Sequence, residues 1–479
     1  MPAISGDDYL RRIDQLKTEV WYNGQKISGP ISQHPAFRGA MKSQAELYDI
    51  QLKDNYKELM TYPSPTTGDR IGTSYLQPIT KYDLFKRGKM IRTWAKKHGG
   101  MMGRSPDYMN TIVMAFAASA SFLKGKTNCF PERLVKFYEE AREKDLSFTH
   151  TFINPQVNRS EYYVEDSKDP IAARIVDETD EGVIIKGARL LATQGGMTDE
   201  ILVFSAGGIF EDDNAYFFSI PSNARGLKFI CRESFQKGDS TFNYPLSSRF
   251  EEMDSIVVFD HVLIPWERVF SYKNIEVGNH FQRSSAFLPF NLHQVIHRQI
   301  VKLEFALGVA EEIIQSIKIA GYENVQSKMA DVIVGLESMK GLLTKAEANA
   351  KTDEFGLMRP EVAPLQAASS AFPTIYPRVI EIIQLLGASG LISIPTEADF
   401  NSELRCDLNQ YLQSATLDAE ARVKLFRLAW DLTMSPFGTR QTQYERFFFG
   451  NPYKLASELY FGYDKQGARE FVQLFMDEI

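Results

Sequence analysis

The sequence has little cysteine, no long apolar run and no excess of basic residues. Its three cysteines, Cys129, Cys231 and Cys406, are too widely spaced for a CxxC metal site and too few for a disulfide framework. The longest apolar stretch, residues 112–123, is too short to span a membrane, and residues 1–12 lack the apolar core of a signal peptide. With 54 basic and 61 acidic residues, the net charge of -7 provides no field suited to nucleic acid or an anionic membrane. We therefore expect a cytoplasmic protein that binds neither.

Several common catalytic signatures are also missing. The chain contains no P-loop, no GxSxG, no HExxH and no EF-hand pattern. The glycine pattern LLGASG, which ends at Gly390, follows a helical stretch, so it is more typical of a helix cap than of a nucleotide-binding turn. What is present is an aromatic content of 12%, with 33 Phe and 21 Tyr, which suits either a large core or a planar ligand.

The hydrophobic periodicity divides the 479 residues into successive segments of predicted helix and strand. Residues 1–148 are predicted to be helical, and residues 149–272 consist of short β-rich runs separated by Gly, Asn and Asp turns. No helices separate these runs, which favours an antiparallel barrel or sandwich over a Rossmann sheet. Four long helical stretches, at 288–319, 324–350, 361–386 and 402–432, predict a bundle within residues 273–435, and residues 436–479 form an aromatic-rich tail. This order resembles the acyl-CoA dehydrogenase architecture, so we expect a mainly α protein with a central antiparallel β domain.

Individual stretches offer candidate site residues but no function. In GRSPDYMN, Ser105, Pro106 and Asp107 have the pattern of a helix start with a capping hydroxyl, while a neighbouring arginine and tyrosine suggest a site. His293 and His297 stand four residues apart on a predicted helix, but no third metal ligand is recognisable, so ordinary core or surface histidines are the favoured interpretation.

Six segments taken together resemble one family. GRSPDY, THTFINPQVNR, LLATQGGMTDEILVF, DHVLIPWERVF, LLGASGL and YERFFFGNP occur in the order and spacing of the oxygenase component of the 4-hydroxyphenylacetate 3-hydroxylase family. This resemblance, which covers essentially the whole chain, implies an acyl-CoA dehydrogenase-like fold and a homotetramer (a dimer of dimers). It also implies a flavin-dependent monooxygenase that hydroxylates a phenol ortho to its hydroxyl, through a C4a-hydroperoxyflavin. FAD would be used as FADH2 supplied by a separate NAD(P)H:flavin reductase, with molecular oxygen as co-substrate.

The resemblance also implies roles for particular residues. Arg104, Tyr108 and His150 match the positions that surround the phenol oxygen, with His150 as base, Arg104 as charge stabiliser and Tyr108 as hydrogen-bond donor. Thr193 matches a position that hydrogen-bonds the flavin near N5. The remaining expected cofactor contacts are Thr151, Gln156, Arg159, Leu190, Ala192, Arg446, Phe449, Gly450 and Asn451, together with His150.

The residues expected to contact the far end of the substrate depart from the family pattern. Ser205 and Ala206 match the substrate-contacting pair, and an alanine at 206 offers no donor beyond its amide, which leaves open 4-hydroxyphenylacetate, a chlorophenol, a tyramine-like amine or free phenol. The glycine turn from Gly387 to Gly390 matches a segment that touches the cofactor of a neighbouring subunit in relatives of this fold.

Three alternatives remain. 4-Hydroxybutyryl-CoA dehydratase requires three cysteines and one histidine for a [4Fe–4S] cluster; His293 matches the histidine, but no cysteine lies between Met1 and Asn128. An acyl-CoA dehydrogenase would use a bundle carboxylate such as Glu361 or Glu381, and nothing singles either out. A non-catalytic flavin-binding protein would have no need for three polar groups at one site.

Overall fold

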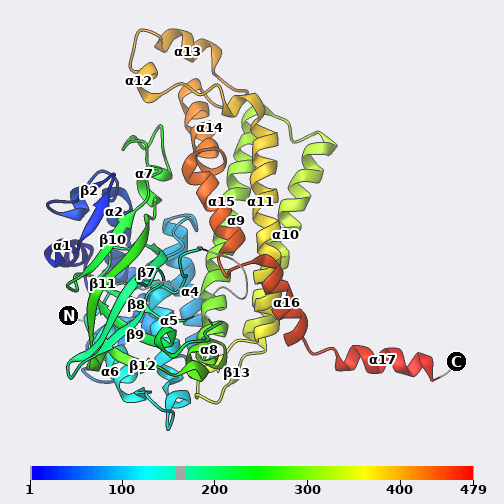
Figure 1. Cartoon of the computed structure of the whole chain (residues 1–479). Helices are drawn as coiled ribbons and strands as arrows, with labels where there is room; N and C mark the ends of the chain where they lie inside the picture. Colours follow the sequence, from blue (N-terminus) through cyan, green and yellow to red (C-terminus); the bar gives the residue numbers. More distant parts are fainter. Residues whose placement is uncertain (1–2, 158–168, 206, 478–479) are drawn as a thin grey trace.

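The computed structural model describes residues 3–157, 169–205 and 207–477, so the expected site residues Arg159 and Ala206 lie outside the described residues. A mixed β domain lies on one side, a helical bundle on the other, and the chain ends in a helical tail that extends away from the body (Figure 1). The predicted fold class, mainly helical with a central β domain, is confirmed.

The N-terminal region forms six helices: α1 (Gly6–Leu16), α2 (Arg38–Leu52), α3 (Asp54–Met60), α4 (Lys81–Lys97), α5 (Pro106–Ala118) and α6 (Pro131–Lys144). Capping boxes start two of them, because Ser5 with Asp8 and Thr80 with Asp83 exchange side-chain and backbone hydrogen bonds. The region is not wholly helical as predicted. It also contains β1 (Val20–Tyr22), β2 (Gln25–Lys26), β3 (Thr61–Pro63) and β4 (Arg70–Gly72).

The β domain consists of two sheets. The larger has the order β2-β1-β10-β11-β7-β6, and the smaller has the order β12-β9-β8-β5. Most neighbours are antiparallel as predicted, but β1 pairs with β10 and β5 pairs with β8 in parallel. The remaining strands are β5 (Phe148–Thr151), β6 (Arg174–Glu178), β7 (Gly182–Thr193), β8 (Glu200–Val203), β9 (Tyr216–Pro221), β10 (Leu227–Cys231), β11 (Asp254–Pro265) and β12 (Val269–Tyr272), with the short helix α7 (Ser247–Phe250) before β11.

Three of the four predicted bundle helices are continuous: α9 (Phe287–Ile317), α10 (Glu323–Ala348) and α11 (Val362–Gly387), with α8 (Ile275–Ser284) before them. The fourth is not, because residues 412–418 interrupt it and separate α13 (Arg405–Tyr411) from α14 (Ala419–Thr433). Asp418 caps α14 by accepting a hydrogen bond from the amide of Ala421, which starts a new helix where a continuous one was expected. The short elements here are β13 (Lys351–Thr352), β14 (Met358–Arg359) and α12 (Glu397–Phe400).

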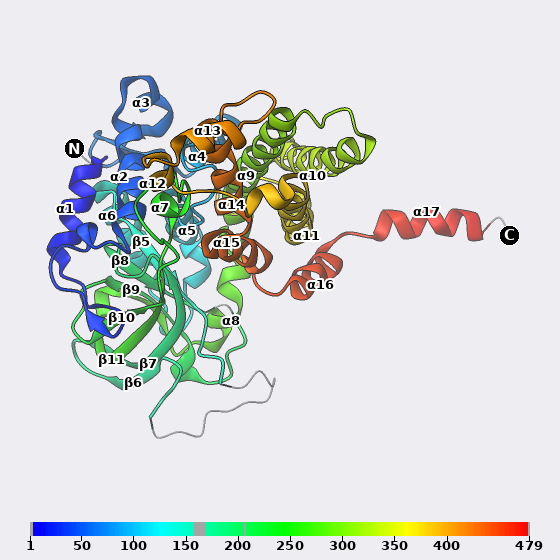
Figure 2. The same ribbon diagram turned by 90° about the horizontal axis from the view of Figure 1, so that it is seen from above.

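The last segment of the chain forms α15 (Pro436–Phe447), α16 (Pro452–Gly462) and α17 (Gln466–Met476). Helix α15 packs on α11 and α14, and α16 packs on α11. Seen from above, α17 lies away from every other element (Figure 2), and it has no buried residue.

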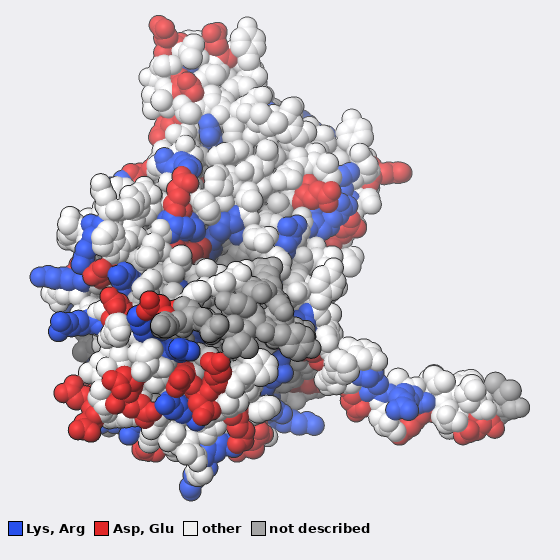
Figure 3. All heavy atoms as spheres, viewed as in Figure 1, with Lys and Arg blue, Asp and Glu red and all other residues white. Residues whose placement is uncertain are grey.

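Separate apolar cores hold these parts together. One joins α4 to the bundle, one surrounds α5 and reaches β5 and β8, and one fills the space between the two sheets. Helix α5 is buried over almost its whole length, so it fixes the relative positions of the β domain and the bundle. Acidic and basic side chains are interspersed on the face shown in Figure 3, and no helix among the described residues is long and apolar enough to cross a membrane.

Candidate active site

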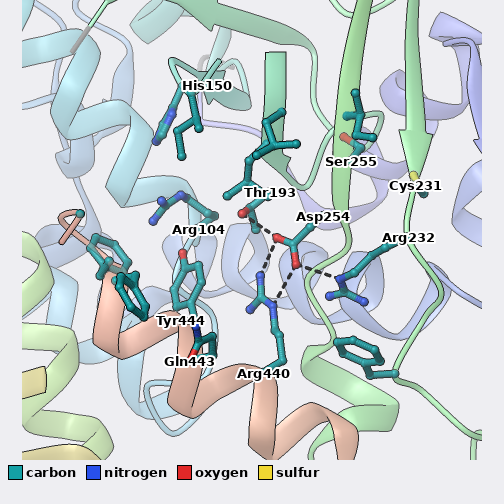
Figure 4. Close-up of a pocket in the computed structure, with 18 of the residues that line it drawn as sticks. Arg104, His150, Thr193, Cys231, Arg232, Asp254, Ser255, Arg440, Gln443 and Tyr444 are labelled. Atoms are coloured by element: carbon teal, nitrogen blue, oxygen red, sulfur yellow. Dashed lines mark hydrogen bonds and ion pairs between the residues drawn. The ribbon is translucent and has the colours of Figure 1, made fainter. Parts of the chain in front are cut away.

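A cavity of about 1550 Å³ lies between the β domain and α15. Its walls come from the loop before α5, from β5, β7, β10 and β11, and from residues 434–451 (Figure 4). Small-molecule sites commonly measure about 300–1,000 Å³, so this cavity has room for a dinucleotide cofactor beside a small aromatic molecule. The expected site residues that line it are Arg104, His150, Gln156, Leu190, Thr193, Phe449, Gly450 and Asn451.

Arg104 is held at one end of the cavity by its backbone. The Glu252 carboxylate accepts hydrogen bonds from the amides of Gly103, at 2.8 Å, and Arg104, at 2.7 Å. The ring of Tyr444 packs closely against Gly103, and a β-carbon at position 103 would force that ring to shift. The Arg104 guanidinium lies over the rings of Tyr108, at 4.1 Å, and Phe448, at 4.6 Å. Among the described residues no carboxylate forms an ion pair with it, so its charge is available to an anionic ligand.

The predicted helix start is confirmed, but the predicted capping bond is wrong. Helix α5 begins at Pro106 with Ser105 as the N-cap residue, yet the Ser105 hydroxyl makes no bond to the helix backbone. It donates instead to the Asp107 carboxylate at 2.6 Å, and Asp107 also accepts from the amide of Gln294 at 2.8 Å. The segment is therefore fastened to α9 by a side-chain network.

His150 is a buried imidazole on β5 without a hydrogen-bond partner on either ring nitrogen among the residues described. Its ring packs beside Phe152, at 5.2 Å, and Tyr108, at 5.7 Å between centroids. Burial, with a smaller contribution from the charge of Arg104, lowers the pKa of His150 well below its ordinary value. The ring is neutral at physiological pH, and it can offer a lone pair or a proton to a ligand.

Tyr108 projects from α5 to a smaller, adjoining cavity of about 140 Å³. Phe152, Phe448 and Phe449 line both cavities, and the neighbouring rings of Tyr108 and His150 lie where the two cavities adjoin. The smaller cavity also contains Asn291, whose amide oxygen and nitrogen are buried without partners in the described part of the chain. An orphaned buried amide is costly without a ligand or water.

A carboxylate, Asp254, organises the other end of the large cavity (Figure 4). It accepts the Thr193 hydroxyl at 2.8 Å, Arg440 at 2.7 and 3.0 Å, and Arg232 at 2.9 Å. Burial acts to raise the pKa of Asp254, but attraction to Arg440 and Arg232 outweighs it and lowers that pKa to about 2. Because the Thr193 hydroxyl donates its proton to Asp254, its oxygen can only accept a hydrogen bond from a ligand.

These features fit a flavin. Apolar side chains of Leu191, Ile230 and Ile256 provide apolar wall area. Several polar atoms of lining residues have no hydrogen-bond partner in the described chain. They are both His150 ring nitrogens, the Tyr444 hydroxyl and one Arg440 nitrogen. Apolar walls with a few convergent polar groups are the usual character of a cofactor site.

Other expected site residues lie outside the cavity lining. Thr151 donates its hydroxyl to the Leu191 carbonyl of β7 at 2.9 Å, and Ala192 is a buried residue of β7 that pairs with Ser255 of β11. Arg446 is exposed on α15, and Ser205 accepts a hydrogen bond from the Gly207 amide at 3.2 Å. Neither cavity includes Arg446 or Ser205.

The carboxylates nominated for an acyl-CoA dehydrogenase are also outside both cavities. Glu361 accepts a hydrogen bond from Asn349 at 2.8 Å, and Glu381 pairs with Arg378 at 2.7 Å. Sequence reasoning missed five lining or supporting residues, namely Arg232, Glu252, Asp254, Arg440 and Tyr444. The only available signal was the spacing of Arg440 and Tyr444, which places them on one face of a helix; Tyr444 is the first residue of YERFFFGNP, and Arg440 lies one turn before it.

Comparison with known proteins gives consistent matches over the full length. The family description "4-hydroxyphenylacetate 3-hydroxylase N terminal" matches residues 5–271, and "4-hydroxyphenylacetate 3-hydroxylase C terminal" matches residues 278–477. A probable 4-hydroxyphenylacetate 3-monooxygenase of Bacillus subtilis (strain 168) is 56% identical over 477 residues, covering 99% of both chains. The oxygenase component of 4-hydroxyphenylacetate 3-monooxygenase from Thermus thermophilus is 42% identical, covering 99% of this chain and 98% of its own.

Solved structures agree with these matches. A crystal structure of an oxygenase component of 4-hydroxyphenylacetate 3-monooxygenase, complexed with FAD and 4-hydroxyphenylacetate, superposes with a TM-score of 0.94 at 42% identity and covers 99% of both chains. An archaeal 4-hydroxybutyryl-CoA dehydratase superposes with a TM-score of 0.87 at 18% identity, covering 100% of this chain and 95% of its own. At that identity the likeness concerns the fold alone.

Proposed function

Because this chain belongs to the 4-hydroxyphenylacetate 3-hydroxylase family, we propose that it is the oxygenase component of a two-component, flavin-dependent monooxygenase. Its substrate is a phenol, 4-hydroxyphenylacetate or a close relative, and its product is the catechol hydroxylated ortho to the existing hydroxyl. One observation carries the proposal: a single cavity joins the Arg104 and His150 end to the Thr193 and Asp254 end. The first end suits a phenol oxygen, and the second suits a flavin ring.

The residues that would hold FAD line the second end. Thr193 presents an acceptor oxygen, and Leu190 of β7, Gln156 and residues 449–451 of the tail line the same cavity. When bound, reduced FAD supplies the electrons that activate molecular oxygen for transfer to the aromatic ring. The cavity has apolar walls, which exclude water and so protect reactive oxygen species from wasteful release.

Arg104 and His150 would prepare the phenol. A phenolate donates electrons to an electrophilic oxygen far better than a phenol, so stabilising the anion accelerates transfer. The unpaired guanidinium of Arg104 favours the phenolate, and the neutral His150 has a free ring nitrogen to take the phenolic proton. The low pKa of His150 makes it a weak base, and the ion pair between phenolate and Arg104 offsets that cost. Tyr108 would orient the substrate from the adjoining cavity.

The partners follow from the same assignment. An oxygenase component requires a separate NAD(P)H:flavin reductase, and the reaction fits a cytoplasmic setting, where nicotinamide cofactors are available. We further propose a homotetramer, which the exposed apolar helix α17 supports. The glycine turn from Gly387 to Gly390 and the tail are the segments that would reach a neighbouring subunit. We propose domain limits of 1–148, 149–272, 273–435 and 436–479, with β1 and β2 of the first segment joining the larger sheet of the β domain.

A coupled assay tests the function. The purified chain is mixed with an FAD reductase, NADH, oxygen and a panel of para-substituted phenols, and catechol is measured by chromatography. We expect catechol from 4-hydroxyphenylacetate or a related phenol. A chain that binds reduced FAD and yet forms no catechol from any phenol would overturn the proposal.

A variant tests the role of His150 in the same assay. His150→Asn keeps a polar group but removes the base, so catechol formation should fall by about 100-fold or more while NADH oxidation continues and hydrogen peroxide accumulates. His261→Asn, at an exposed histidine on β11, is the matched control and should behave as the unmodified chain. Unchanged coupling in His150→Asn would remove His150 as the base.

A further inference from the structure

Two histidines that sequence reasoning left without a third partner acquire one in the fold. His293 and His297 lie one turn apart on α9, and Glu347 on α10 reaches both. The Glu347 carboxylate oxygen is 2.9 Å from His293 Nε2 and 3.0 Å from His297 Nε2, and the two Nε2 atoms are 3.2 Å apart. Three potential ligand atoms therefore form a nearly equilateral triangle.

The size of this triangle matches the coordination shell of a small divalent ion. Zn²⁺ binds imidazole nitrogen and carboxylate oxygen at about 2.0–2.2 Å, which places neighbouring ligands of a tetrahedron roughly 3.3 Å apart. Two histidines with one glutamate constitute a common protein ligand set for zinc, with a fourth position left for water. Within the described chain, His293, His297 and Glu347 form the group of potential metal-ligating side chains whose ligand atoms lie close enough together to share one ion.

The surroundings leave space for an ion. Gly88 of α4 faces the cluster, and a β-carbon at this position would lie 2.6 Å from His297 Nε2 and 3.2 Å from the Glu347 oxygen. Any larger residue would therefore press on the ligand atoms. The Glu347 side chain retains 30% of its exposure, while those of His293 and His297 retain 1% and 6%, so an ion and its water would enter from the Glu347 side.

The charge state also suits a cation. A histidine binds a metal ion through a ring nitrogen, and the Nε2 atoms of both rings face the same Glu347 carboxylate oxygen. The nearby cation Arg92 is paired with Glu304 at 3.0 Å, which offsets its repulsion. The Glu347 carboxylate, which contacts both rings, supplies negative charge at the site.

We propose that His293, His297 and Glu347 form a binding site for a divalent transition-metal ion of the zinc class. The site lies outside both cavities of the proposed active site, since none of the three residues lines either. A bound ion would clamp α9 to α10 beside α4, which gives it a structural role independent of the hydroxylation. The metal-free alternative has both histidines donating to the same glutamate oxygen.

The test uses the full chain. Protein stripped with a chelator is incubated with ZnCl2 alone, passed through a desalting column and analysed by elemental mass spectrometry. We expect about one zinc per chain to be retained, and Co²⁺ in its place should give visible absorption bands typical of tetrahedral coordination. Loading should also raise the melting temperature, because an ion that binds only the folded state stabilises it.

Glu347→Gln removes the carboxylate ligand of the proposed site. Glu337→Gln, at an exposed carboxylate on the same helix, is its matched control. Zinc retention should fall by about tenfold or more in Glu347→Gln and stay unchanged in Glu337→Gln, with both variants folded by circular dichroism. Absence of retained zinc in the folded, unmodified chain would overturn the proposal. So would equal retention in the two variants.

Discussion

Asp254 is the residue on which the flavin end of the cavity depends. It binds one hydroxyl and two guanidinium groups, and these come from β7, from the residue that follows β10 and from α15, so its charge holds three segments in register. Replacing it by asparagine keeps the shape but removes the carboxylate shared by Arg440 and Arg232, which leaves Glu252 3.9 Å from Arg440 and Glu251 2.6 Å from Arg232. Removing one partner of a buried ion pair destabilises a protein strongly, because the other charge stays buried without compensation.

We predict that Asp254→Asn lowers the free energy of unfolding by about 3 kcal/mol and weakens FAD binding, since a single uncharged amide oxygen would have to serve Thr193, Arg440 and Arg232 in place of a carboxylate. Urea unfolding measures the first effect, and fluorescence titration with FAD measures the second. Asp260→Asn, at an exposed position on the same strand, is the matched control and should change neither. Normal FAD affinity in a folded Asp254→Asn chain would contradict the positioning role.

The sequence allowed some of these residues to be predicted and not others. Arg104, His150 and Thr193 lie in segments that carry a family resemblance, and all three line the cavity. Asp254 and Arg440 are separated by 186 residues, and their pairing depends on how α15 packs across the β domain. A contact over that distance has no local periodicity or spacing to reveal it.

At the scale of single elements, α4 ends on a histidine that should make stability depend on pH. His98 is buried, and its Nδ1 accepts a hydrogen bond from the Met102 amide at 3.1 Å. Burial, assisted by repulsion from Arg298 and Lys302, lowers the pKa of His98 to about 3. Unfolding exposes the ring and returns its pKa to about 6.5. Below that pH the unfolded chain binds a proton at this histidine that the folded chain does not bind, which favours unfolding.

The contribution of His98 is thus complete above about pH 6.5 and is lost as pH falls toward 3. We predict that His98→Asn, whose amide oxygen can replace Nδ1 as acceptor, shows a shallower loss of stability between pH 6.5 and 4.5, by up to about 1.4 kcal/mol per pH unit. Denaturant unfolding at several pH values measures it. An identical slope in His98→Asn and the unmodified chain would exclude this origin, and His261→Asn, at an exposed site, should leave the slope unchanged.

Periodicity predicted long elements better than short ones. Helices α9, α10 and α11 follow sustained apolar repeats and end within a few residues of the expected limits. Strand β1 has only three residues, Val20–Tyr22, and exists because β10 provides a pairing edge from another part of the chain. Such a strand is a product of tertiary structure, and the surrounding helical pattern conceals it.

For the whole molecule, the tail is the feature that the isolated chain leaves unexplained. Helix α17 projects from the body with Phe471, Leu474 and Phe475 each more than half exposed. Apolar surface of this kind on a free arm marks a protein–protein contact. In a homotetramer the arm would pack on a second copy of the chain.

We predict that the complete chain has a solution mass near four times its 54.5 kDa, and that the double variant Phe471→Ser/Phe475→Ser dissociates into smaller species. Light scattering coupled to size-exclusion chromatography measures both. Gln473→Ser, on the same helix, should leave the mass unchanged. A double variant that retains the full mass would assign assembly to another surface.

Glu252 has a further consequence for how the protein matures. Its carboxylate binds the amides of Gly103 and Arg104, accepts from Gln194 at 3.0 Å, and lies 3.9 Å from Arg440. These partners are distributed from the first quarter of the chain to its last tenth. Residue 440 must therefore have left the ribosome before these contacts can form, so we expect the pocket to close only late in synthesis.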